Sequence, residues 1–386
     1  MTEAFIVQAV RTAGGKRNGA LAGVHPADLG ATVLDALIER SGLDPALIED
    51  VIVGCVTQAG EQSFAFGRNM VLSSCLPESV PAVTVDRQCG SSQQAMHFAF
   101  QAVMSGAQDI VIAAGAESMT RVPMGSNFRL HAKAGIGDGP WSRRILERYG
   151  VEEFNQFVSA QRIADKYGLS REAMDEFALL SHQKAAQAIQ SGAFKQEIVP
   201  VQCENGLFDQ DEGVRFDASL EAMSKVRSIL EGGSVTAANA SQMTDGAAGI
   251  LIASEDAVRR FNLAPIARVC NLTVTAGDPV LMLEEPIPAT RKALARAKLN
   301  LDDIDLFEIN EAFASIPMAW LSALGVDPAK LNVHGGAIAL GHPLGATGAK
   351  LMTTLVHTLA SRGLRYGLQA MCEGGGTANV TIVERL

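Results

Sequence analysis

Two cysteines and one histidine, far apart along the chain, adjoin elements that would bring them to one edge of a fold. Cys89 follows a short apolar strand expected over residues 83–85 and precedes a helix expected to reach about residue 104. His342 opens a second helix, and Cys372 ends the apolar segment 368–371. An imidazole can act as a general base, and a thiolate is a strong nucleophile. The three residues predict a pocket for covalent catalysis.

The position of Cys89 favours a reactive thiol. A helix N-terminus and a nearby imidazole can lower a thiol pKa by several units from about 8.5. Gly90 would let a substrate approach the backbone, and amide groups of the first helical turn would hold a developing oxyanion. The local sequence alone leaves a buried structural thiol as the alternative.

His342 lies in a glycine-rich stretch, residues 332–348, which contains five glycines and two histidines. The stretch lacks Gly-Lys-Ser/Thr and the dinucleotide-binding glycine spacing, so it is not a phosphate loop of those kinds. Between Gly341 and Pro343 the imidazole is held in place, which suits a general base or an oxyanion donor.

Asn310 follows a strand expected over residues 306–309. Its side chain there can donate a hydrogen bond, directly or through water, to an enolate oxygen. The equally good local alternative is that Asn310 caps the helix that follows.

The elements around these residues repeat. A helix over residues 26–40 leads through an acidic connector to the strand 51–53, and a helix over 288–297 leads through a similar connector to the strand 306–309. We interpret this as a duplicated α/β unit. Alternating strands and helices predict mostly parallel sheets covered on both faces, with ligands at the carboxyl ends of the strands.

Residues 119–245 interrupt the repeat. Residues 121–150 have little periodicity, whereas helices are expected over 156–167 and 171–190, the second with Ser170 as its N-cap. The insertion is a candidate lid or ligand-gripping subdomain. A purely structural or oligomerisation insert is the alternative.

Composition excludes several classes of protein. The chain has 386 residues and a net charge of −10 without a basic run, which argues against nucleic acid or an anionic membrane as partner. It has no apolar run of about 18 residues and no signal-peptide layout, so a cytoplasmic location is expected. The six cysteines lack Cys-x-x-Cys spacing, so they predict free thiols rather than a metal site.

Four short segments together resemble the active-site loops of the thiolases. They are Cys89-Gly90-Ser91, Asn310-Glu311-Ala312-Phe313, Gly341-His342-Pro343 and Cys372-Glu373-Gly374. Segments 115–119 and 239–248 match the same family, and the resemblance runs from Val7 to the C-terminus in the family's order.

The resemblance implies an α/β class thiolase fold, with two duplicated α/β halves in a layered αβαβα arrangement and an inserted loop domain. The first half would comprise residues 1–118 plus 246–264. The loop domain would comprise residues 119–245 and grip coenzyme A, and the second half would comprise residues 265–386.

The resemblance also implies a ping-pong acyl transfer. His342 would help to ionise Cys89, which becomes acylated, and Cys372 would move protons to and from the acetyl-CoA carbanion and CoA. Asn310, through a water, and His342 would form one oxyanion hole, and the amides of Cys89 and Gly374 the other.

For substrate binding, the resemblance places Ser241 near the pantetheine, Arg215 near the adenine, and Ala312 and Phe313 along the pantetheine tunnel. A solvated surface arginine is the alternative for Arg215. Coenzyme A and acyl-CoA would be substrates, with no permanently bound cofactor and no metal. A homo-oligomer, a dimer or a homotetramer built from dimers, is expected.

The expected activity is thiolytic cleavage of 3-ketoacyl-CoA, as in fatty acid β-oxidation, or the reverse condensation. Gln242 and residues 121–124 resemble degrading members, while His334, Asp86 and Gln161 depart from the family pattern. The alternatives are an acetoacetyl-CoA-forming acetyltransferase, a ketoacyl-synthase-like condensing enzyme, which would require two histidines, and a non-catalytic CoA or lipid carrier. A nicotinamide-dependent oxidoreductase is disfavoured by the missing Gly-x-Gly-x-x-Gly.

Overall fold

The architecture is that of a computed structural model, which describes residues 3–204 and 206–386. Its strands are β1 (Ala4–Thr12), β2 (Gly15–Lys16), β3 (Asp50–Gly54), β4 (Ala82–Val85), β5 (Ile110–Ser118), β6 (Ile198–Val199), β7 (Val201–Cys203), β8 (Gly206–Phe208), β9 (Thr244–Ser254), β10 (Ala267–Ala276), β11 (Leu306–Ile309), β12 (Tyr366–Glu373) and β13 (Thr377–Arg385).

The α-helices alternate with these strands. They are α1 (Pro26–Ser41), α2 (Phe66–Leu72), α3 (Ser91–Ser105), α4 (Ser126–Ala134), α5 (Arg143–Tyr149), α6 (Gln156–Lys166), α7 (Arg171–Ser191), α8 (Leu220–Ser224), α9 (Glu255–Arg260), α10 (Pro286–Ala297), α11 (Ser315–Leu324), α12 (Ala337–Leu340) and α13 (Thr347–Arg362). Among the described helices, none combines the length and the apolarity needed to cross a bilayer.

The main sheet follows the order β11-β12-β13-β10-β1-β9-β5-β3-β4, with β2 and β6 attached to β9 and β1. The prediction of mostly parallel pairing is wrong. β3 pairs in parallel with β4 and β5, and β11 with β12, whereas the pairs of β1, β9, β10 and β13 that build the middle of the sheet are antiparallel. Between β12 and β13 only Gly374-Gly375-Gly376 connect the strands, too short a connection for the crossover that a parallel pair needs.

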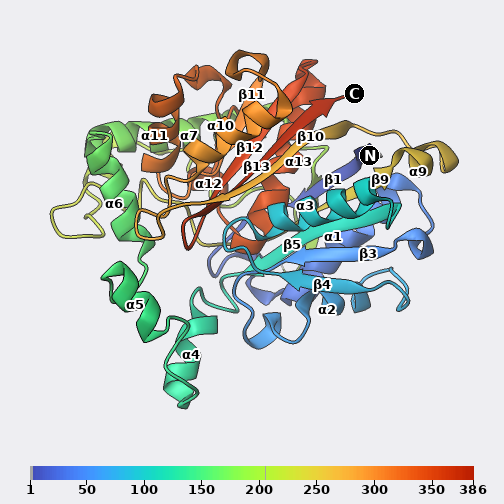
Figure 1. Cartoon of the computed structure of the whole chain (residues 1–386), viewed down its shortest axis with the longest axis horizontal. Helices are drawn as coiled ribbons and strands as arrows, with labels where there is room; N and C mark the ends of the chain where they lie inside the picture. Colours follow the sequence, from blue (N-terminus) through green and yellow to red (C-terminus); the bar gives the residue numbers. More distant parts are fainter. Residues whose placement is uncertain (1–2, 205) are drawn as a thin grey trace.

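Successive side chains along a strand point to opposite faces of the sheet and pack in different hydrophobic cores. Val51 and Val53 face a core shared with α1 and α2, while Ile52 faces a core shared with α3 and α13. Phe307 and Ile309 pack with α10 and α11 on the far side of the second half. Helices α3 and α13 therefore lie between the two halves, which confirms the layered αβαβα arrangement (Figure 1).

The segment between β5 and β9 contains α4 to α8 and the β7–β8 hairpin. Helices α6 and α7 agree with the prediction to within one residue, and the Ser170 hydroxyl accepts a hydrogen bond from the Ala173 amide at 3.2 Å as the expected cap. Residues 121–150, whose sequence has little periodicity, contain α4 and α5, which stand away from the rest of the molecule (Figure 1). Both helices are short and largely exposed, so their apolar repeat is too brief to be recognised in the sequence.

The second half is anchored by Trp320 of α11. Its side chain is fully buried, its ring centroid lies 5.1 Å from that of Phe307, and its Nε1–H donates to Thr290 Oγ1 at 3.0 Å. We expect Trp320→Ala to lower the free energy of unfolding by about 3–5 kcal/mol, because it leaves a large cavity and removes the hydrogen bond to Thr290. Urea denaturation followed by circular dichroism measures this loss.

Leu207→Ala is the matched control, because Leu207 of β8 is 69% exposed and its truncation should change stability by no more than about 0.5 kcal/mol. Equal effects of the two substitutions would contradict the assignment of Trp320 to the core.

Candidate active site

Cys89 sits in a tight turn between β4 and α3. The Asp86 carboxylate accepts a hydrogen bond from the Gln88 amide at 2.7 Å, and Gln88 adopts the left-handed conformation with φ 49°. A non-glycine residue in this region stores strain, which the surrounding contacts must hold. The turn fixes Cys89 as a half-buried side chain immediately before the helix.

The amide groups after Cys89 correct one expectation. Those of Gly90 and Ser91 donate to Arg87 O at 3.1 Å and to Gln88 O at 3.0 Å, so the turn itself uses them. They are not free to hold an oxyanion.

Cys372 lies near Cys89 because the loops that follow β4 and β12 pack closely against each other. A β-carbon at Gly90 would lie 1.8 Å from Glu373 Oε1, and one at Gly374 would lie 2.9 Å from Gln88 Oε1. Gly90 was expected to admit a substrate, but the space beside it is occupied by Glu373. The loops can pack this closely only because both positions lack side chains.

His342 is held through its backbone and through its ring. Its amide donates to Gln242 O at 3.0 Å and to Thr244 Oγ1 at 3.2 Å. Its Nδ1 lies 2.6 Å from Thr347 Oγ1, whose own hydrogen is donated to Pro343 O at 2.8 Å. Thr347 must therefore accept, which places the imidazole hydrogen on Nδ1 and leaves the lone pair on Nε2.

Asn310 joins the imidazole to the second thiol. Its Nδ2 lies 3.5 Å from His342 Nε2, and its side chain is also hydrogen-bonded to Cys372, where it lowers the pKa of that thiol against the opposing effect of burial. Asn310 does not cap the next helix: α11 begins at Ser315 with Ala314 as N-cap. Asn310 Oδ1 is buried and has no hydrogen-bond partner among the described residues. Asn310, His342 and Cys372 thus belong to one site, and the turn that carries Cys89 packs on the loop after Cys372.

Burial dominates the electrostatics of the site. It lowers the pKa of His342 to about 3, aided by the positive charge of Lys350, and it raises the pKa of Cys372 to about 12. Burial, followed by the charges of Cys372 and Glu373, also raises the pKa of Cys89 well above its usual value. The expected lowering of the Cys89 pKa by the helix terminus is therefore wrong for this structure, because desolvation of the thiolate outweighs it.

A buried carboxylate, Glu117 at the end of β5, was missed as a positioning residue. Its oxygens accept hydrogen bonds from the amides of Val56, Thr57 and Gly345, each at 2.9 Å, and from Gln62 Nε2 at 3.0 Å. Glu117 thereby ties the loop after β3 to the loop that carries His342. The only available sequence signal was an acidic residue closing an apolar strand.

Glu311 has a similar duty in the second half. It accepts from Ser181 Oγ at 2.7 Å, from Asn332 Nδ2 at 2.9 Å and from the Ile338 amide at 3.2 Å. These contacts fix the segment beside Asn310 to α7 and α12.

Three of the four residues expected to bind CoA come together. The Ser241 amide donates to Ala312 O at 3.0 Å, and Ala240 forms a β-bridge with Phe313. Phe313 packs edge-to-face on Phe157 of α6, with centroids 5.7 Å apart. Arg215 is exposed, and its amide donates to His182 Nδ1 at 3.1 Å.

His334, whose role the sequence left open, lies elsewhere. Its ring packs edge-to-face on Phe194 at 5.8 Å, and burial, followed by the charges of Arg362 and Lys184, lowers its pKa to about 4. It is therefore a neutral packing residue at physiological pH.

Comparison with known proteins agrees with this geometry. The family model described as "Thiolase, N-terminal domain" matches residues 4–256, and "Thiolase, C-terminal domain" matches residues 263–385. The chain is 53% identical over 387 residues to the steroid 3-ketoacyl-CoA thiolase FadA6 of Mycobacterium tuberculosis, covering 100% of this chain and 95% of that protein.

It is also 42% identical over 395 residues to the acetyl-CoA acetyltransferase of Escherichia coli, with both chains fully covered. The crystal structure of the Bacillus anthracis acetyl-CoA acetyltransferase superposes with a TM-score of 0.92 at 34% identity, covering 100% of this chain and 99% of that one. The chain belongs to the thiolase family.

Proposed function

We propose that this thiolase cleaves 3-ketoacyl-CoA by covalent acyl transfer through Cys89. The observation that carries the proposal is a chain of contacts between four separate loops. Asn310 contacts both His342 and Cys372, and the charge of Cys372 acts on Cys89. Two thiols and one neutral imidazole in a buried site can divide nucleophilic attack from proton transfer.

In the first half-reaction, Cys89 Sγ attacks the 3-keto carbon while its proton passes to His342 Nε2. The bond between C2 and C3 then breaks, and the carbanion on C2 takes the thiol proton of Cys372 and leaves as acetyl-CoA. In the second, the Cys372 thiolate takes the proton of CoA, whose sulfur attacks the acyl-Cys89 thioester. Cys89 leaves and recovers its proton from His342.

The hydrogen-bond pattern of His342 supports this division. Because Thr347 holds the hydrogen on Nδ1, Nε2 is the basic nitrogen at pH 7 and becomes a donor once it has taken the Cys89 proton. It can then share with Asn310 the stabilisation of an oxyanion. The amides of Cys89 and Gly374 would supply the second oxyanion hole.

We further propose that the segment 119–245 grips coenzyme A, with Ser241, Ala312 and Phe313 along the pantetheine and Arg215 toward the adenine. The contact of Ser241 with Ala312 and the exposure of Arg215 support this order. Coenzyme A and acyl-CoA enter as substrates.

The degradative direction and a bulky acyl group are proposed from the FadA6 relative, whose name specifies steroid 3-ketoacyl-CoA. Formation of acetoacetyl-CoA is the second candidate, because the E. coli relative is an acetyl-CoA acetyltransferase. Thiolysis rates with acetoacetyl-CoA, longer 3-ketoacyl-CoAs and a ring-bearing 3-ketoacyl-CoA separate the two.

Exposed apolar side chains and free thiols support a cytoplasmic homo-oligomer, a dimer or a tetramer. β4 ends the order of the main sheet and carries Val83, which is 47% exposed. The neighbouring helix α2 ends at Leu72, which is 58% exposed, and follows Phe64, which is 92% exposed. All six cysteines are free, as a reducing compartment would keep them.

Cys89→Ala should lower kcat for acetoacetyl-CoA thiolysis at least about 10³-fold, because the variant lacks the nucleophile that takes the acyl chain. The loss of Mg-enolate absorbance in the presence of CoA measures the reaction. Cys75→Ala, which removes an exposed thiol, should retain wild-type turnover. Wild-type turnover by Cys89→Ala would rule out the covalent mechanism.

Cys372→Ala should still form the acyl-enzyme from a simple acyl-CoA donor, while cleavage of 3-ketoacyl-CoA falls by about 10²–10⁴-fold for want of the proton donor. Intact-mass spectrometry detects the acyl adduct on Cys89. A variant that cannot be acylated would show that Cys372 has another duty.

Glu373 should give thiol reactivity a specific pH dependence. Burial raises its pKa to about 8, and its charge in turn raises the pKa values of Cys89 and Cys372. Below pH 8 the carboxyl is neutral; above it, the carboxylate opposes thiolate formation. Glu373→Gln should therefore alkylate at Cys89 about 3- to 10-fold faster than wild type at pH 9.5 and equally fast at pH 6.5.

Iodoacetamide labelling of Cys89, quantified by peptide mass spectrometry across this pH range, measures the ratio. A ratio that does not change with pH would contradict an electrostatic effect of Glu373.

A further inference from the structure

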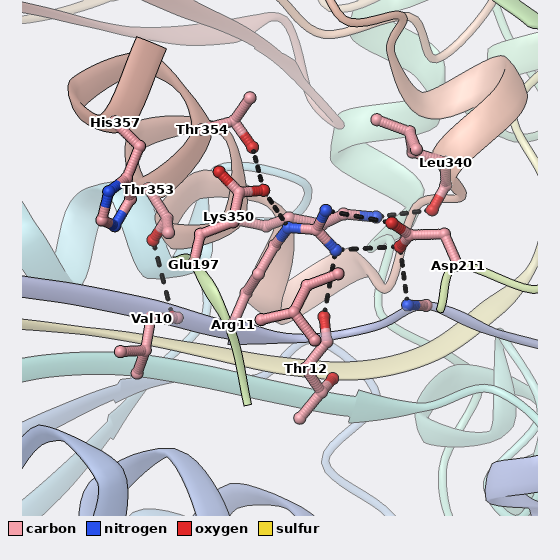
Figure 2. A network of polar contacts seen from close by, with 12 residues as sticks. Val10, Arg11, Thr12, Glu197, Asp211, Leu340, Lys350, Thr353, Thr354 and His357 are labelled. Atoms are coloured by element: carbon pink, nitrogen blue, oxygen red, sulfur yellow. Dashed lines mark hydrogen bonds and ion pairs between the residues drawn. The ribbon is translucent and has the colours of Figure 1, made fainter. Parts of the chain in front are cut away.

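Four charged side chains form a buried cluster next to the loop of His342 (Figure 2). Arg11 of β1, Glu197 and Asp211 of the insertion, and Lys350 of α13 are each at most 5% exposed. Arg11 Nε lies 2.6 Å from Glu197 Oε1, and its two terminal nitrogens lie 2.8 and 3.0 Å from the two Asp211 oxygens. The cluster therefore joins three separate parts of the chain.

The charges of the cluster balance only if Lys350 is counted. Arg11 faces two carboxylates, which leaves one negative charge in excess, and the ammonium of Lys350 cancels it. Buried ions are costly, and a well-packed apolar cluster of the same volume would serve stability as well or better. The presence of these ions therefore points to a positional role.

Lys350 donates its hydrogen bonds to the backbone before His342, not to the carboxylates. Its Nζ lies 2.5 Å from Leu340 O and 3.2 Å from Gly341 O. Gly341 has φ 82°, and a β-carbon there would lie 2.1 Å from Thr244 Oγ1. Two consecutive carbonyls aimed at one point repel each other, and a buried cation holds them together.

We propose that Lys350 is a positioning residue that fixes the Leu340–Gly341 turn and so aims Nε2 of His342 at Cys89. Asp211 and Glu197 keep Lys350 charged in the interior. The insertion thereby contributes to the placement of the base, in addition to binding substrate. This inference rests on the proposed role of His342 in acylating Cys89.

The pH dependence of acylation is a readout that a purely structural role of Lys350 would not change. Burial lowers the pKa of Lys350 to about 8 against the charge of Asp211, with Arg11 and Glu197 contributing in opposite senses. The charge of Lys350 in turn helps burial to lower the pKa of His342. The other titratable groups at the site, the Cys89 and Cys372 thiols and the Glu373 carboxyl, are neutral at low pH. Removing the ammonium leaves a net negative cluster, so His342 would protonate at higher pH.

The test measures single-turnover acylation of Cys89 by acetoacetyl-CoA from about pH 4 to about pH 10 in wild type, Lys350→Met and Lys350→Arg. Lys350→Met should acylate about 10- to 100-fold more slowly at pH 7, with KM within about two-fold of wild type. It should also lose rate between about pH 6 and pH 4, where wild type does not. Lys350→Arg should recover both properties to within about three-fold, because it keeps the charge and the donors.

Thr358→Val, a buried substitution two turns further along α13, is the matched control and should acylate like wild type. If Lys350→Met does not fold, Asp211→Asn replaces it. Because Asp211 helps to keep Lys350 protonated, its loss should make acylation fall at a lower alkaline pH than in wild type.

The inference would be overturned if Lys350→Met acylated at the wild-type rate and kept that rate at acid pH. It would also be overturned if acylation by Asp211→Asn fell at the same alkaline pH as in wild type. Either result would leave the covalent mechanism intact. Absence of acylation in wild type would instead overturn the proposed function.

Discussion

A buried imidazole can serve as a base for a thiol only if one ring nitrogen keeps its lone pair and points toward the thiol. Here the hydrogen bond between His342 Nδ1 and Thr347 Oγ1 meets that requirement. Thr347 opens α13 and has already committed its hydrogen to Pro343 O, so it acts on the imidazole purely as an acceptor. The same turn is fixed from behind by Glu117 through Gly345 and by Lys350 through Gly341. The orientation of one ring thus rests on contacts from both halves of the fold.

Burial that orders the site also makes its thiols weak acids. Neither Cys89 nor Cys372 is a thiolate at rest near neutral pH, because desolvation raises both pKa values. For Cys372 this is useful, since a thiol that holds its proton firmly is a suitable donor to a carbanion, which is a far stronger base. For Cys89 it means that ionisation must be coupled to the approach of the acyl group and to proton uptake by His342.

The grouping of Cys89, Asn310, His342 and Cys372 was predictable because three of them adjoin a strand end and His342 precedes a helix of the second repeat, and a duplicated α/β unit gathers such loops at one edge. The layered arrangement was implied by the resemblance to the thiolases. What escaped prediction depends on contacts between remote segments. Nothing near Gly90 in the sequence indicates that Glu373 fills the space beside it, and nothing near Lys350 indicates two backbone carbonyls as its partners. The antiparallel centre of the sheet was underestimated although the three glycines before Thr377 signalled a hairpin.

The insertion and the second half share one hydrophobic core, in which Ile163 of α6 and Met174 of α7 pack with residues of β11 and α11. An evolutionary or engineered exchange of this segment between relatives would therefore transplant only one side of a packed interface. Chimeras that carry the matching faces of β11 and α11 along with the segment should remain soluble and cooperative, whereas those that cut at its ends would expose unmatched apolar surface. Diversification of acyl recognition in such a scaffold is more easily reached by side-chain changes within the segment than by swapping it whole.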